Sequence, residues 1–325
     1  MKLLRRQFLH IAAGAAALPA MVDLGRAQAY PARPVHIIVG FAPGSAADII
    51  ARLIGQRLSE RLGQPFVVEN RGGAGGSLGA EAVAHASPDG YTLLLSGSAD
   101  AVTATLYEKL NYNFIRDIVP VASIASGPLV LVVHPSFPAR TVPEFIAYAK
   151  ANPGKISFGS ASTGTVAHMA GELFKVMAGI NMVHVPYRGL APALNDLLGG
   201  QVQAVFSTTP SAMGHIQAGR LRALAVTSAM RFEALPDLPT IGDFLPGYEA
   251  TITVGLSACK NTPVEIINRV NKETNVALAD PDMKAKLAGL GVAPLSMAAA
   301  DYGKLIADET EKWGKVIRAA GIKAE

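Results

Sequence analysis

The chain has 325 residues, of which 50% are hydrophobic and 17% are charged, enough apolar material for two buried cores and too much for intrinsic disorder. The formal net charge is +4 at pH 7, and residues 1–29 supply three of these charges because they hold four basic residues and one acidic residue. The remaining chain is almost neutral and has no long run of Lys or Arg, which excludes the clustered basic face of a nucleic-acid-binding protein.

Residues 1–29 have the parts of a secretory signal peptide. A basic start precedes an apolar stretch at 8–21, and Ala27-Gln28-Ala29 matches the small-residue pattern cleaved before Tyr30. Residues 4–9 also resemble a twin-arginine export signal, a route that the pattern leaves open. A membrane anchor is disfavoured because no stretch reaches the roughly 18 apolar residues of a spanning helix. We therefore expect an exported, periplasmic protein.

After Tyr30, short β-branched runs alternate with longer helical periods, which is typical of βαβ units and parallel sheets. The first set predicts strands at 35–41, 66–69 and 92–95, with helices at 45–62 and 78–85. The second set predicts strands at 129–133, 156–159, 183–185, 204–206 and 223–227, with helices at 142–151, 166–178 and 191–198. We expect two sheets of similar build, each with its own helices.

A proline-rich passage at 235–247 cannot continue a helix or a central strand, so it indicates a surface crossing. An apolar strand at 251–258 and helices at 264–278, 281–287 and 298–320 follow it. The order predicts a discontinuous domain 1 of residues 30–127 plus 251–325, and a domain 2 of residues 128–250. Two crossings would form a hinge, with a cleft between the domains for a small ligand.

Two loops have the composition of anion sites. In residues 41–48, a strand end leads into a tight turn and a helix that Ser45 caps, with Asp48 reaching back in the manner of a capping box. Residues 159–165 repeat this design with a hydroxyl-rich loop before a helix that starts near Thr165. Exposed backbone N–H groups at such helix starts bind anions, although ordinary βα loops use the same residue types for turns.

A third loop, the glycine-rich stretch 70–79, invites two enzyme interpretations. Residues 75–79 match the G-x-S-x-G nucleophile pattern around Ser77, but flexible glycine precedes it where the pattern requires a strand. The dinucleotide fingerprint lacks its third glycine because Leu78 stands there, and a phosphate-binding loop lacks its lysine. This loop therefore fits a chain reversal near the cleft better than a catalytic element.

Metal binding has little support, because the histidines after residue 30 never fall at the spacings of a metal site. His168, just inside the helix after the second loop, is the one histidine with a predicted site role, and a core or helix-start role stays open. Cys259 is the sole cysteine and cannot form an internal disulfide. We expect no metal and no cofactor.

With these loops in place, the chain resembles the Bug-type extracytoplasmic solute receptors, the binding proteins of tripartite tricarboxylate transporters. The resemblance covers the chain after the signal peptide. The motifs that carry it are residues 41–48 with Ala51-Arg52, the glycine loop 70–79, and residues 165–174, 185–189, 196–200 and 218–225. It implies a type II periplasmic-binding-protein fold, an α/β architecture of two domains that close on a ligand, and carboxylate recognition by backbone and hydroxyl donors.

The candidate ligand-binding residues combine the two loops with positions carried over from the family: Ala42, Gly44, Ser45, Asp48, Ser98, Ser160, Thr163, Thr165, His168 and Ser207. The chain departs from the family pattern at Ser162, where glycine is common, at Ser207-Thr208, where an Asp-Asn pair is common, and at Asp100, in a usually uncharged loop. We hypothesise that Asp100, if it faces the cleft, disfavours a plain dianion; a solvated loop position is the alternative.

The resulting prediction is an exported, monomeric receptor, not an enzyme, that captures a small organic carboxylate and delivers it to membrane permease subunits. An exported serine hydrolase that uses Ser77 and a ligand sensor for a two-component kinase are the alternatives. No nucleic-acid partner is expected.

Overall fold

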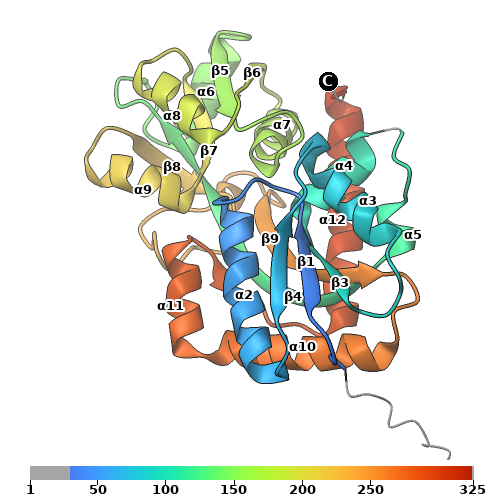
Figure 1. Ribbon diagram of the computed structural model, residues 1–325. Coiled ribbons are helices and arrows are strands. Elements are labelled where there is room, and N and C mark those ends of the chain that lie inside the picture. Colours follow the sequence, from blue (N-terminus) through green and yellow to red (C-terminus); the bar gives the residue numbers. More distant parts are fainter. Residues whose placement is uncertain (1–29, 108, 324–325) are drawn as a thin grey trace, which may run out of the picture. The chain divides into compact units, whose positions relative to one another are not determined.

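Ten strands form one hydrogen-bonded network in the computed structural model, which describes residues 30–107 and 109–323 (Figure 1). The predicted signal peptide lies outside the described residues. The described residues from Arg33 onward belong to one compact unit. The strands are β1 (Val35–Val39), β2 (Phe66–Asn70), β3 (Thr92–Gly97), β4 (Ile118–Val133), β5 (Ile156–Ser160), β6 (Met182–Pro186), β7 (Ala204–Thr208), β8 (Arg222–Val226), β9 (Thr251–Cys259) and β10 (Ala293–Pro294).

The long strand β4 joins the two sets of strands that the sequence predicts as separate sheets. On one side the order is β2-β1-β3-β9-β4, with β1 parallel to β2 and β3, and β9 antiparallel to β3 and β4. On the other side β4 pairs with β7 and β8, and β5 lies parallel between β6 and β7. The partner of β4 changes from β9 to β7 and β8 between Pro128 and Leu129. The division into two domains at 127/128 and 250/251 stays a prediction.

Helices surround these strands in both sets. They are α2 (Ala46–Leu62), α3 (Ser77–Ala84), α4 (Ser98–Leu106), α5 (Phe114–Asp117), α6 (Val142–Ala151), α7 (Val166–Ala178), α8 (Leu190–Leu198), α9 (Thr209–Gln217), α10 (Val264–Ala279), α11 (Pro281–Gly289) and α12 (Ala299–Ala320), with 3-10 turns η1 (Ala74–Gly76) and η2 (Ile241–Asp243). No helix of the described residues is long and apolar enough to cross a membrane.

Helices α4, α5 and α9 were not predicted from the sequence. Each is short, from four to nine residues, and such lengths are marginal without tertiary contacts. Helix α4 contains three hydroxyl residues and gains its support from α12, which packs along it (Figure 1). Packing by a distant part of the chain therefore stabilises α4.

The largest core joins α4 and α12 to the second set of strands. Ala101 and Leu106 of α4 and Trp313 of α12 pack in one cluster with Val166 and Phe174 of α7. A separate cluster lies beneath α3 and α5 around Ile38 and Tyr302. The C-terminal end of α4 is therefore held against the start of α7, beside the second predicted loop.

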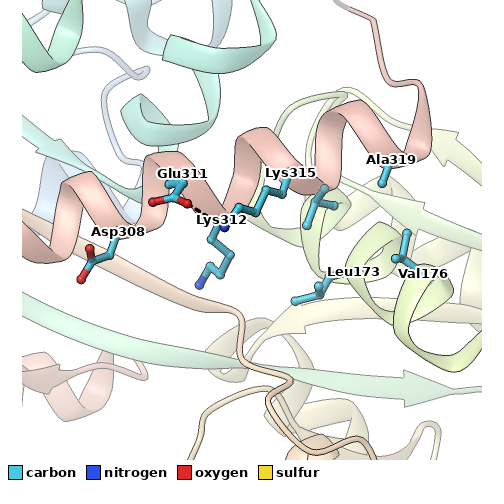
Figure 2. Close-up of a pocket in the computed structure, with 8 residues that line it drawn as sticks. Leu173, Val176, Asp308, Glu311, Lys312, Lys315 and Ala319 are labelled. Carbon is cyan, nitrogen blue, oxygen red and sulfur yellow. Dashed lines mark ion pairs between the residues drawn. The ribbon is translucent and has the colours of Figure 1, made fainter.

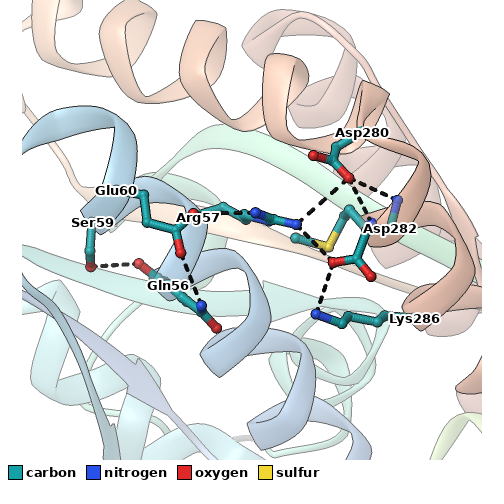
Figure 3. A network of polar contacts seen from close by, with 9 residues as sticks. Gln56, Arg57, Ser59, Glu60, Asp280, Asp282 and Lys286 are labelled. Carbon is teal, nitrogen blue, oxygen red and sulfur yellow. Dashed lines mark hydrogen bonds and ion pairs between the residues drawn. The ribbon is translucent and has the colours of Figure 1, made fainter.

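Ion pairs of Arg57, in the C-terminal half of α2, fix that helix to α11. The guanidinium of Arg57 lies 3.6 Å from Asp280 and 2.8 Å from Asp282, and Asp282 also pairs with Lys286 at 2.9 Å (Figure 3). Asp280 caps α11 through the N–H groups of Asp282 and Met283. These exposed pairs contribute little energy individually, but they fix where α2 lies.

Candidate functional site

The first predicted loop joins β1 to α2 and is built around the N-cap of that helix. The hydroxyl of Ser45 accepts a hydrogen bond from the backbone N–H of Asp48 at 3.3 Å. Gly44 has φ +79°, a conformation that glycine adopts without a Cβ clash. Ala42, Gly44 and Ala46 are exposed, so the turn presents its backbone to solvent.

Asp48 anchors this loop from below. Its buried carboxylate accepts hydrogen bonds from the Gly44 N–H at 2.9 Å, Arg52 Nε at 3.0 Å and Asn70 Nδ2 at 2.9 Å. Asn70 also donates to the carbonyl of Phe41 at 3.0 Å, which ties the loop to the end of β2. The hydrogen bond from Arg52 is the main cause that lowers the pKa of Asp48 to about 2, although burial acts against it. Asp48 therefore stays ionised and shapes the turn.

The second loop joins β5 to α7 and repeats the N-cap design with other groups. The Thr165 hydroxyl accepts from the N–H of His168 at 3.3 Å and donates to the carbonyl of Ser162 at 2.9 Å. The fully buried Ser160 hydroxyl donates to the same carbonyl at 2.9 Å. The N–H of Gly164 donates to Nδ1 of His168 at 3.1 Å. The side chains of Ser160, Thr165 and His168 thus hold the loop from within.

Two stacked histidine rings lie beneath this loop. The ring centroids of His168 and His184 are 3.7 Å apart with an interplanar angle of 14°. Burial, then the neighbouring His184 and Lys175, lower the pKa of His168 to about 3. Burial and Lys175 lower the pKa of His184 to about 4. Both rings are therefore neutral at physiological pH, and Lys175 pairs with Glu172 at 2.8 Å beside them.

The end of α4 lies between the glycine loop and the second loop. A Cβ at Gly75 would come within 2.7 Å of Thr103, and a Cβ at Gly164 within 2.6 Å of Leu106. The glycine loop in turn touches the first loop, because a Cβ at Gly40 would lie 2.7 Å from the Cα of Gly76. A chain of close contacts therefore runs from the first loop through the glycine loop and α4 to the second loop.

Ser98 and Asp100 occupy the first turn of α4, and both are buried. The Ser98 hydroxyl accepts from the N–H of Thr253 at 2.9 Å, and Asp100 accepts from the N–H of Gly97 at 2.9 Å. Burial raises the pKa of Asp100 to about 7. The solvated-loop alternative for Asp100 is therefore wrong. Its carboxyl lies in the interior near Tyr302, whose pKa is raised mainly by burial and further by Asp100. The selectivity hypothesis therefore loses its geometric basis.

The remaining predicted residues differ in exposure. Ser207 is fully buried at the end of β7 and donates to the carbonyl of Thr208 at 3.0 Å. Thr163 is half-buried and Ser162 is exposed. Among the described residues, neither the hydroxyl nor the N–H group of Ser162 or Thr163 donates a hydrogen bond to another residue. The second loop leaves these four donors without a partner in the part of the protein that the structure describes, so they are available to a ligand.

Ser77 begins α3 and is buried. Its hydroxyl donates to the carbonyl of Ala74 at 2.8 Å, within a 3-10 turn that replaces the strand of a nucleophile elbow. Within residues 30–107 and 109–323, no three His, Cys, Asp or Glu side chains are grouped so that they could hold a metal ion.

Two surface cavities lie away from the loops. One, of about 420 Å³, runs between α7 and α12, where Leu173 and Val176 face Lys312 and Lys315 (Figure 2). The other, of about 520 Å³, is lined by Tyr107, Tyr112 and neighbouring residues. None of the ten predicted ligand-binding residues lines either cavity.

Sequence reasoning missed two residues that shape the loops, Asn70 and His184. The sequence contains an indication for Asn70, because this residue ends the strand next to β1 and its amide can both donate and accept hydrogen bonds. His184 had none, because only the register that pairs Phe158 with His184 brings its ring to Ser160.

Known proteins are similar to this chain over most of its length. The family model described as tripartite tricarboxylate transporter family receptor matches residues 50–322. Protein BugT of Bordetella pertussis is 39% identical over 300 residues, which is 91% of this chain and 92% of that protein.

Solved structures agree. The periplasmic binding protein BugD is 34% identical with a TM-score of 0.77, over 91% of this chain and 100% of that one. A protein of R. palustris, solved with adipate, is 35% identical with a TM-score of 0.80, over 90% and 99% of the two chains. MatC from Rhodopseudomonas palustris, with bound malate, is 31% identical with a TM-score of 0.76, over 89% and 100%. The predicted periplasmic-binding-protein fold is confirmed.

Proposed function

The chain belongs to the family of tripartite tricarboxylate transporter receptors, and from this premise we propose that it is a periplasmic receptor that captures a small organic carboxylate. The bound ligand passes to membrane permease subunits. The receptor acts as a monomer and has no catalytic role. Residues 1–29 direct export, by either the general or the twin-arginine route.

The observation that carries this proposal is the pair of capped helix starts, α2 after the first loop and α7 after the second. Each presents the backbone N–H groups of a helix terminus, where the helix dipole favours negative charge. The free N–H and hydroxyl groups of Ser162 and Thr163 add neutral donors. Arg52 is already bound to Asp48, so neutral donors carry the recognition.

The ten predicted residues then differ in role. Ala42, Gly44, Ser45 and Thr163 belong to the loop surfaces that meet the ligand. Asp48, Ser160, Thr165 and His168 fix those surfaces from within. Ser98 and Ser207 are buried at the start of α4 and the end of β7, where they bond to β9 and to Thr208. Neutral donors can bind any carboxylate, and the adipate and malate in the two R. palustris structures support a ligand of this class.

We also propose the predicted division into two domains, with the ligand in a cleft between them. The change of pairing partner in β4 at Pro128 supports it, since Pro128 pairs with Thr251 of β9. Both proposed crossings therefore lie side by side, as the two strands of a hinge do.

A ligand screen by thermal shift tests the proposal. Di- and tricarboxylates, including adipate and malate, are compared with aromatic acids, amino acids and nicotinate-like compounds. A true ligand at 100 times its dissociation constant adds about 2.7 kcal/mol to the free energy of unfolding. Calorimetric titration of a hit should give one site for each chain. A panel without any stabilising carboxylate would contradict the proposal.

The alternatives are separated by different measurements. For the serine hydrolase, Ser77→Ala would abolish turnover of ester substrates; for a receptor, it leaves carboxylate binding in place. For a sensor, the liganded protein would change the activity of a two-component kinase, whereas a transport receptor restores uptake in cells that contain the permease subunits.

A further inference from the structure

The stacked histidines beneath the second loop have a proton arrangement that the hydrogen bonds fix. The Ser160 hydroxyl lies 2.9 Å from the carbonyl of Ser162, which can only accept. Two oxygens at this distance repel unless a hydrogen lies between them, so the single hydroxyl proton belongs on this contact. Nε2 of His184 lies 2.7 Å from the same hydroxyl oxygen. With the Ser160 proton on its contact to Ser162, Nε2 of His184 is the donor to the hydroxyl oxygen.

His168 is fixed in the same way. Gly164 donates its N–H to Nδ1 of His168 at 3.1 Å, so Nδ1 is the acceptor and carries no proton. Its proton therefore lies on Nε2, which is 3.8 Å from the carboxylate of Glu172. The hydrogen bonds therefore favour the Nε2–H tautomer for both histidines.

A directed relay of hydrogen bonds follows. It runs from Nε2–H of His184 to the hydroxyl of Ser160, and from that hydroxyl to the carbonyl of Ser162. The same carbonyl also accepts from Thr165 at 2.9 Å. With its carbonyl held by two hydroxyls, the peptide between Ser162 and Thr163 has one orientation, and this sets where the N–H of Thr163 points.

We propose that His184 is a positioning residue of the ligand site, which orients the Ser162–Thr163 peptide through Ser160 and so directs the free donors of the second loop at the ligand carboxylate. This inference rests on the proposed function. His184 itself is in β6, next to Phe158 at a ring-centroid distance of 5.0 Å, and its hydrogen bond to the loop runs through Ser160.

The first test reads the tautomer without a ligand. Long-range ¹H–¹⁵N correlation spectra of the purified protein at pH 7.5 should show His168 and His184 as neutral Nε2–H tautomers. An Nδ1–H tautomer of His184 overturns the relay. Ser160→Ala should shift the ring signals of His184, because it removes the hydroxyl that the ring contacts.

The second test measures binding of adipate and malate by calorimetry. His184→Phe keeps a ring against Phe158 but removes the donor, and we expect a loss of about tenfold in affinity, the effect of one lost hydrogen bond. His184→Gln retains an amide donor at the ε position and should restore most of the affinity. His85→Phe, the same change at an exposed histidine, should leave binding unchanged.

A double-mutant cycle distinguishes positioning from general damage. Ser160→Ala and His184→Phe should reduce affinity by the same mechanism, so the double variant should bind no more weakly than the weaker single variant. Additive losses contradict the relay, as does a His184→Gln variant that binds as weakly as His184→Phe.

The failure of the proposed function and the failure of this inference give different results. If the wild-type protein binds no carboxylate of the panel, the proposed function fails. If the wild-type protein binds and His184→Phe binds equally well, only the positioning role fails.

Discussion

The two ligand loops share one backbone design but are held by opposite chemistry. Each follows a parallel strand, contains a glycine at φ +79° and enters a helix capped by a hydroxyl residue. Charge holds the first loop, where Asp48 binds Arg52, Asn70 and the N–H of Gly44. Neutral groups hold the second, where His168 and His184 act through Gly164 and Ser160.

The difference teaches that the same turn can be rigid for different reasons, according to its surroundings. The first loop is exposed, so a charged network remains partly solvated. The second lies against the largest core, where neutral imidazoles hold the loop and the charges beside them, Glu172 and Lys175, are paired with each other. The two loops should therefore respond differently to packing changes, to loss of charge and to acid.

The largest expected effect comes from placing alanine at the matched glycines. Gly44→Ala and Gly164→Ala introduce the same backbone strain, but a Cβ at Gly44 meets nothing within 4 Å, whereas one at Gly164 lies 2.6 Å from Leu106. We expect Gly44→Ala to cost about 1 kcal/mol and Gly164→Ala about 3 kcal/mol in urea unfolding. In a Leu106→Ala background, Gly164→Ala should cost less stability than it costs in the wild type, because the clashing side chain is gone. An equal cost in both backgrounds would mean that the clash is relieved elsewhere.

Removing the charge of the first loop should have the next largest effect. Asp48→Asn weakens the bond to Arg52 and turns one acceptor into a donor, which faces another donor in either orientation of the amide. We expect a loss of about 2 kcal/mol in the free energy of unfolding, together with weaker binding of adipate or malate. Glu60→Gln, at an exposed carboxylate of the same helix, is the control and should change stability by less than about 0.5 kcal/mol. Equal losses in the two variants would argue against the anchor.

Acid should weaken the two loops in different pH windows. The pKa values of His168 and His184 are lowered to about 3 and about 4, so the unfolded chain binds protons first and stability falls as the pH drops below 6.5. The pKa of Asp48 is lowered to about 2, so its contribution is lost only below 3.8. His184→Gln should flatten the pH dependence of unfolding between 6.5 and 4, with Glu172 and Lys175 retained. Asp48→Asn should flatten it only below 4.

The smallest effect is expected at Asp100, which belongs to neither loop. Burial raises the pKa of Asp100 to about 7. The folded chain therefore keeps a proton that the unfolded chain loses, and the protein becomes less stable as the pH rises from 3.8 to 7. Asp100→Asn should therefore be more stable than the wild type at pH 8, by on the order of 1 kcal/mol. The order of affinities across the ligand panel should not change. A changed order would restore the hypothesis that this side chain meets the ligand.

The sequence by itself determined the parts of the molecule that depend on local pattern. The alternation of β-branched runs and amphipathic periods predicts most strands and long helices within a few residues. The cap at Ser45 and the helix start near Thr165 were identified correctly. These features follow from backbone preferences and neighbouring side chains, which the order of residues contains.

Tertiary structure alone determined the contacts between residues that are far apart in the sequence. The helix α4, too short and too rich in hydroxyls to be expected, exists because α12 packs along it, and it places Leu106 beside Gly164. The register of β5 with β6 brings His184 to Ser160, and burial turns Asp100 from a candidate ligand contact into an interior acid. Such contacts join residues far apart along the chain, and no local pattern encodes them.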